Sequence, residues 1–338
     1  MFDDARLDNE SALAAADAQL RLLAEAGARV RRESAAATDA IATAVAAASG
    51  ERPRAVVAAG PDSRLLRAVL EPWCPVPFVA WPAPSLPGWA GALDLVVVLA
   101  PEGSDVGSAS AVAEAVRRGC QLVVACPAGS LVAEHAGGRH TTLLPTESED
   151  QLATAVVVLD LMDRLALGPR TDPEAVAEAL DEVAIACSPL RDLAVNPAKM
   201  LAIAVADATP LFWGGSVLAA RAGRRVAESV RRVSGRTALA TDAEHLLPVI
   251  GAAAAPDVFA DPFAEEEDLR RPVLVVLDDG TDEATIREQR RRLLAAAEER
   301  RVRVETVRTE AAEELARYAH LLATGNYAAT YLGLGLTD

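Results

Sequence analysis

The sequence predicts an α/β fold in which helices cover both faces of parallel sheets. Three observations support this prediction: short runs that are almost continuously apolar, helical stretches that alternate with them, and a second round of the same pattern later in the chain. Strands that are apolar at nearly every residue are buried on both faces, and helices between them make the crossover connections of a parallel sheet. We therefore expect α/β rather than α+β.

The first round of the pattern begins after an Ala- and Leu-rich N-terminal segment. Residues 10–49 contain no proline and carry apolar residues at helical spacing, which predicts one or two helices that end before Gly50 and Pro53. The apolar runs that follow predict strands at 55–59, 78–81, 93–99 and 121–126. The stretches that predict helices are 64–70, 109–118, 149–167 and 173–187.

The second round predicts strands at 211–214, 272–277 and 302–307. Its strand, polar loop, helix, arginine pair and strand echo the same order in the first round, which is typical of two copies of one structural unit. We therefore expect two doubly wound parallel-sheet units in one chain. The expected boundaries are a helical segment at 1–50, a first unit at 51–165, a helical connection at 166–206, and a second unit at 207–338 with an insertion near 234–269.

Composition excludes several classes of function. The 338 residues are 51% hydrophobic and carry a formal net charge of −16, which repels nucleic acids and anionic membranes. No apolar stretch reaches the roughly 18 residues of a membrane span, and an acidic N-terminus is unlike a secretion signal, so a cytoplasmic protein is expected. The four cysteines lack metal-ligand spacing, and the acidic run at 265–268 is interpreted as a solvated loop. No metal or cofactor is expected.

Ligands of such sheets bind beyond the carboxyl ends of the strands, where loops lead into helices. Glycine and serine in these loops allow close approach and hydrogen bonding, although a plain tight turn explains Gly214–Ser216 equally well. Glu102 and Asp105 disfavour phosphate at the loop that contains them. The candidate substrate-binding residues are Gly60, Ser63, Gly103, Ser104, Gly214, Gly215 and Ser216.

Two side chains are candidates for acid and base catalysis. Glu228 lies on the helix that follows the Gly214–Ser216 loop, and His245 lies in the insertion with Asp242 and Glu244. A glutamate and a histidine that face one pocket would provide a proton-abstracting base and a ring-opening acid or base. The alternatives are an exposed glutamate paired with a neighbouring arginine and an exposed histidine at a helix end.

From about Arg54 onward, the order of segments resembles the bifunctional phosphoglucose/phosphomannose isomerases, which contain two sugar isomerase (SIS) domains. The similar segments are Asn196-Pro197-Ala198-Lys199 before the Leu211–Ser216 strand and loop, the closing Gly325–Leu334 helix, and the Arg117–Cys120 turn. The resemblance implies an aldose–ketose isomerase that acts on glucose, fructose or mannose 6-phosphate through a cis-enediol. It places Glu228 at the position of the catalytic base and His245, with one inserted residue, at that of the ring-opening group.

The phosphate-binding loops depart from this family. The family has G-G-S-G where this chain has Gly60-Pro61-Asp62-Ser63, and S-x-S-G-N-T where it has residues 100–105. An arginine expected after the last strand of the first unit is replaced by the acidic stretch 145–150. These departures favour the alternative, which is a non-catalytic SIS-fold protein that binds a carbohydrate derivative or has a regulatory role. Under either hypothesis the resemblance implies a homodimer in which one subunit completes the other's pocket.

Overall fold

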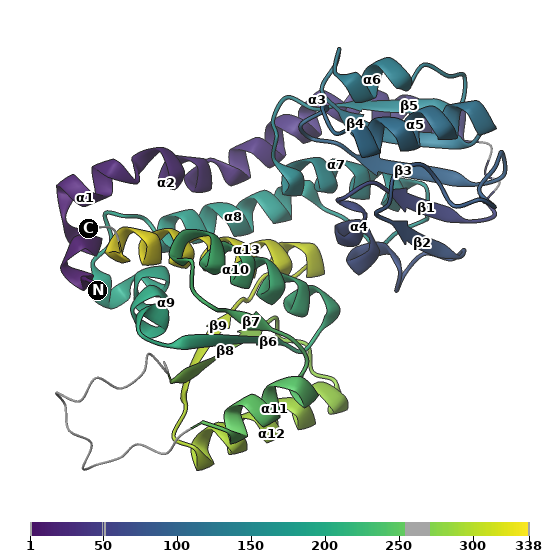
Figure 1. Ribbon diagram of the computed structural model, residues 1–338. Coiled ribbons are helices and arrows are strands. Elements are labelled where there is room, and N and C mark those ends of the chain that lie inside the picture. The colour runs from purple at the N-terminus through teal and green to yellow at the C-terminus, as the bar shows by residue number, and fades with distance from the viewer. Residues whose placement is uncertain (1, 49, 51, 254–270, 337–338) are drawn as a thin grey trace, which may run out of the picture. The chain divides into compact units, whose positions relative to one another are not determined.

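The computed structural model describes residues 2–48, 50, 52–253 and 271–336. In these ranges the chain has one parallel sheet of five strands and a second of four strands, with helices on both faces (Figure 1), which confirms the predicted fold class. The chain divides into two compact units. We call Ala26–Glu178 the first-sheet unit, and Met1–Glu25 with Ala179–Asp338 the second-sheet unit. The domain boundaries given above stay a prediction.

The first sheet has the strand order β2-β1-β3-β4-β5, and all neighbouring strands are parallel. Its central strands are buried at nearly every residue because helices lie on both faces. The strands are β1 (Val56–Ala59), β2 (Phe78–Trp81), β3 (Leu95–Leu99), β4 (Gln121–Cys126) and β5 (Thr141–Pro145).

Helices of the first-sheet unit begin and end at residues suited to those positions. Helix α5 begins after Asp105, whose carboxylate accepts a backbone hydrogen bond, and ends at Gly119, which has a φ of 68°. Helices α5 and α6 pack against one apolar face of the sheet, whereas α3 and α4 contact α7. The helices are α3 (Ala26–Ala47), α4 (Ser63–Leu70), α5 (Val106–Arg118), α6 (Leu131–His135) and α7 (Gln151–Arg164).

The second sheet has the strand order β7-β6-β8-β9, again parallel throughout. Leu211 and Trp213 face α11 and α12, whereas Phe212 lies against Gly223 of α10 on the other face. Figure 1 shows the same layers, with α10 and α13 on one side of the sheet and α11 and α12 on the other. The strands are β6 (Thr209–Gly214), β7 (Leu239–Ala240), β8 (Pro272–Asp278) and β9 (Arg303–Arg308).

The helices of the second-sheet unit surround the long C-terminal helix. Helix α13 packs against α9 and α10, and its Tyr331 hydroxyl donates to the Cys187 carbonyl at 2.7 Å. Helix α9 begins at Pro197 after the capping Asn196, an arrangement that suits a helix start. The remaining elements are η1 (Asp4–Asp8), α1 (Glu10–Ala15), α2 (Asp17–Ala24), α8 (Pro173–Ala186), η2 (Leu193–Val195), α9 (Pro197–Ala206), α10 (Val217–Ser234), α11 (Ala243–Gly251), α12 (Ala284–Glu299) and α13 (Glu314–Leu336).

Candidate functional site

The loop after β1 contains a glycine at a position where a side chain would be strained. Gly60 has a φ of 88°, and a Cβ atom there would lie 2.9 Å from the Ser108 hydroxyl of α5. The Gly60 carbonyl accepts the Ser63 amide at 3.1 Å, which closes the turn into α4. The predicted binding residue Gly60 therefore allows the first turn of α5 to approach this loop.

Ser63 and Ser108 have buried hydroxyl groups. Both residues are buried, and neither hydroxyl has a hydrogen-bond partner within the described residues. The adjacent Asp62 accepts a hydrogen bond from the side-chain amide of Gln151, so its carboxylate is turned toward α7. Ser63, predicted from sequence as a binding residue, is thus buried at the start of α4 with an unpaired hydroxyl.

The loop after β3 carries its own anion at the start of α5. Asp105 Oδ1 accepts the Ser108 amide at 2.6 Å, which satisfies one of the N–H groups that a helix leaves free. Gly103 has a φ of 68°, and a Cβ there would lie 2.4 Å from the Ser130 Cβ, so this glycine serves packing. Ser104 is exposed between them. The donors expected of a phosphate loop are partly occupied by the chain's own carboxylate.

The glycine pair after β6 is explained by close packing. A Cβ at Gly214 would lie 2.3 Å from the backbone carbon of Ala219, and one at Gly215 would lie 2.3 Å from Ile286 Cγ2. Ser216 caps α10 by accepting the Ala219 amide at 3.0 Å, and its hydroxyl donates to the Asp279 carboxylate. The loop is therefore a tightly packed turn whose serine already has two partners.

Glu228 lies on α10 and pairs with an arginine on the same helix. Its Oε2 is 2.6 Å from Arg225 Nη1, and 41% of its side chain is exposed. This is the helical ion pair that the alternative interpretation anticipated, and an exposed pair of this kind contributes about 0–1 kcal/mol. The carboxylate therefore stays accessible, and a modest free energy would release it from Arg225.

His245 stands in the first turn of α11 with an acidic partner. Its Nδ1 lies 2.7 Å from Asp242 Oδ1, and the same oxygen accepts the His245 backbone amide at 3.1 Å. The hydrogen bond from His245 holds the pKa of Asp242 below its usual range. With 74% of the side chain exposed, the imidazole is oriented through Nδ1 and presents Nε2 as its second nitrogen.

One chain does not bring Glu228 and His245 together. Glu228 is on α10, which packs with α13 on one face of the second sheet. His245 is on α11, which packs with α12 on the opposite face. The sheet lies between the two helices, so a pocket that holds both side chains cannot form on either face alone.

In the described part of the second-sheet unit, two buried charges were not anticipated from the sequence. Lys199 is fully buried, and its ammonium donates to Asp8 Oδ1 at 2.6 Å and to the carbonyls of Pro189 and Arg191. Asp278, also buried, accepts two hydrogen bonds from Arg290. Burial would raise the pKa of Asp278, but its hydrogen bonds outweigh burial and the pKa lies below its usual range. The partners are distant in sequence, so spacing gave no signal.

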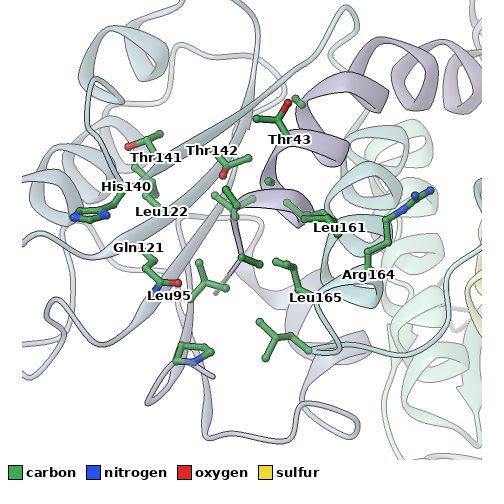
Figure 2. A pocket seen from close by; sticks show the side chains of 18 of the residues that line it. Thr43, Leu95, Gln121, Leu122, His140, Thr141, Thr142, Leu161, Arg164 and Leu165 are labelled. Carbon is green, nitrogen blue, oxygen red and sulfur yellow. The ribbon is translucent and has the colours of Figure 1, made fainter. Parts of the chain in front are cut away.

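A cavity of about 990 Å³ lies in the first-sheet unit at the amino ends of its strands (Figure 2). Leu95, Gln121 and Thr141 line it, and each is the first residue of its strand. Helices α3 and α7 contribute further residues, including Thr43 and Leu161, and loop residues such as His140 also line it. None of the predicted binding or catalytic residues lines this cavity, because they occupy the opposite edge of the sheets or the helices.

Within the described residues, no group of three or more His, Cys, Asp and Glu side chains is arranged to hold a metal ion. The acidic run at 265–268 lies outside the described residues. In the same described part of the chain, no helix combines the length and apolar character needed to span a membrane.

Two parallel sheets with covering helices and Gly/Ser loops at their carboxyl ends define an α/β fold of the SIS type. Residues 194–336 match the family model of the bacterial phospho-glucose isomerase C-terminal SIS domain. The match covers fewer than half of the 338 residues, so it shows what this part of the chain is similar to. Comparison with curated proteins gives no match.

Solved structures agree on the fold over nearly the whole chain. The tagatose-6-phosphate ketose/aldose isomerase of Escherichia coli is 14% identical, with a TM-score of 0.65 over 90% of this chain and 91% of that one. A glucose-6-phosphate isomerase like protein of Thermus thermophilus is 19% identical, with a TM-score of 0.56 over 97% and 92%. The C-terminal domain of glucosamine-fructose-6-phosphate aminotransferase of Francisella tularensis is 10% identical, with a TM-score of 0.56 over 91% and 96%. At these identities the likeness is one of fold.

Proposed function

We propose that the protein is an aldose–ketose isomerase of the SIS type, with Glu228 as the base and His245 as the ring-opening group. The observation that carries the proposal is the His245–Asp242 pair, because a histidine oriented through Nδ1 is arranged for proton transfer at Nε2. The family match over residues 194–336 supports the same reaction class. Glucose, fructose and mannose 6-phosphate, or a related sugar, are the substrates that the resemblance implies.

In this mechanism His245 Nε2 moves a proton between the ring oxygen and the anomeric hydroxyl, which opens the sugar ring. Glu228 then removes the proton from C2 of the open aldose while the C1 carbonyl oxygen gains a proton, which gives the cis-enediol. Glu228 returns its proton to C1 as the C2 hydroxyl loses a proton, which gives the ketose, so that one proton in total has moved from the C2 oxygen to the C1 oxygen. The exposed Glu228 carboxylate first exchanges its contact with Arg225 for the substrate C–H bond. No cofactor enters this sequence of steps.

The proposal includes a homodimer, because Glu228 and His245 lie on helices at opposite faces of the second sheet in one chain. In a twofold dimer, Glu228 of one subunit and His245 of the other can face one pocket, and the symmetry creates two such pockets. A cytoplasmic location belongs to the same proposal.

Deuterium exchange tests the isomerase directly. The protein is incubated in heavy water with fructose 6-phosphate and, separately, with fructose, and NMR follows deuterium at C1 and C2. We expect incorporation with at least one of the two sugars, and a loss of at least about a hundredfold in Glu228→Gln, since a positioned acid–base group contributes about 10²–10⁴-fold. Equal background incorporation by both proteins with both sugars would refute the proposal.

A non-catalytic carbohydrate-derivative-binding or regulatory protein is the second candidate. Two observations favour it. The Asp105 carboxylate accepts a backbone hydrogen bond at the start of α5, and the Asp279 carboxylate accepts one from the Ser216 hydroxyl. Both contacts use groups of the chain that would otherwise bind substrate. Sugar binding measured by calorimetry without any deuterium exchange would support this candidate over the isomerase.

A further inference from the structure

We infer that the carboxyl edge of the first sheet accepts a sugar through hydroxyl or ammonium groups and rejects a phosphate group. The inference goes beyond the proposed function and takes from it only that the ligand is a sugar. It concerns the ligand's chemical class, whereas the proposed function concerns the reaction, so binding and exchange test them separately.

The first argument is the charge fixed at the start of α5. The N-terminus of a helix favours an anion because its free N–H groups and the peptide dipoles point there. In this chain Asp105 supplies that anion, with its carboxylate 2.6 Å from the Ser108 amide. A phosphate group placed at the same helix end would lose this N–H group as a donor and would meet the Asp105 charge at short range.

The second argument is the absence of basic residues from the surrounding loops. Between each strand and the next helix, residues 60–63, 101–108, 127–130 and 146–150 contain no Lys, Arg or His. The same loops carry acidic side chains, among which Glu102 is exposed. Arg29 of α3 reaches the last of these loops, where its Nε donates to Asp150 at 2.8 Å. Phosphate sites depend on opposite charge or on free N–H groups, and here the balance favours a neutral or positive ligand.

The third argument is a pair of buried hydroxyl groups that lack hydrogen-bond partners, which a polar ligand would supply. Ser63 and Ser108 are 1% and 0% exposed, and their hydroxyl oxygens have no partner within the described residues. A buried polar group without a hydrogen bond is unfavourable, so structures retain few of them without a role. Gly60 keeps side-chain atoms away from the Ser108 hydroxyl. A hydroxyl both donates and accepts, which matches the hydroxyl groups of a sugar and the ammonium of an amino sugar.

Calorimetry on the full chain tests the inference with three probes: glucose, glucosamine and glucose 6-phosphate. We expect the wild-type protein to bind glucose or glucosamine more tightly than glucose 6-phosphate. Asp105→Asn keeps the shape of the side chain and its ability to cap α5 while it removes the charge. We expect this variant to bind glucose 6-phosphate about tenfold more tightly than the wild type does, with glucose affinity unchanged.

Asp192→Asn is the matched control, because Asp192 caps η2 in the second-sheet unit through the Ala194 amide at 2.8 Å. It should leave all three affinities unchanged, and thermal unfolding of both variants verifies that they are folded. The inference is overturned if the wild type prefers glucose 6-phosphate, if Asp105→Asn behaves as Asp192→Asn does, or if none of the three probes binds. Binding of glucose or glucosamine without deuterium exchange would support the inference and refute the isomerase.

Discussion

Replacement of Gly214 by alanine should destabilise the protein severely, because the added methyl group meets backbone rather than a movable side chain. The new Cβ would lie 2.3 Å from the Ala219 carbon, 2.5 Å from its oxygen and 2.5 Å from the Ala220 nitrogen. These atoms belong to the first turn of α10, so relief requires the whole helix to shift from β6. Overpacking of well-packed sites typically costs about 1–3 kcal/mol, and three rigid contacts place this change at about 3 kcal/mol.

Urea unfolding followed by circular dichroism measures this loss as a shift of the midpoint. Two other glycines calibrate the result. Gly215→Ala meets the Cγ2 methyl group of Ile286, which is a side chain rather than backbone, and Gly235→Ala meets no atom within 4 Å but has a φ of 64°. Gly215→Ala should cost about 2 kcal/mol because a stiff β-branched side chain must move, and Gly235→Ala about 1 kcal/mol from backbone strain. A Gly214→Ala variant no less stable than these two would refute the packing argument for the loop.

Two further predictions concern the buried charges of the second-sheet unit. Lys199→Met should lower the free energy of unfolding by about 3 kcal/mol, because Asp8 and two carbonyls lose a buried ammonium donor, and urea unfolding with Asp192→Asn as a control measures this. Asp278 has a pKa below its usual range in the folded protein. Its contribution to the free energy of unfolding is therefore present above about pH 4, the pKa of an unfolded aspartate, and is lost as pH falls through the lower pKa of the folded state. The stability difference between wild type and Asp278→Asn should therefore shrink in acid, and a constant difference down to about pH 2 would contradict this assignment.

The fold could be predicted largely from the sequence because its central strands are apolar at nearly every position. Leu95–Leu99, for example, is buried throughout and was predicted from its composition alone. Strand β5 was missed because Thr141-Thr142 opens it and its residues are mostly half-buried at the sheet edge. Strand β7 was missed because two residues give no periodic signal. Sequence patterns thus identify strands through burial, and edge strands have little of it.

The loops that carry the candidate binding residues could be located from the sequence, but their packing could not. Gly60 and Gly103 have positive φ values at the carboxyl ends of strands, as loops of this kind require. The sequence also indicated that Asp105 opposes phosphate, but the structure was needed to show that it occupies the helix start. The contact of Lys199 with Asp8 joins residues 191 positions apart, and local spacing carries no information about such a pair.

Mixing two inactive variants tests the central claim most directly. Glu228→Gln and His245→Asn are unfolded together, refolded as a mixture, and assayed for deuterium exchange beside each variant alone. If each pocket combines Glu228 of one subunit with His245 of the other, half of the dimers are mixed and each has one intact pocket, so exchange should return to about a quarter of the wild-type rate. Exchange in the mixture that stays at the level of the single variants, from wild-type protein that is active and dimeric, would contradict the shared site.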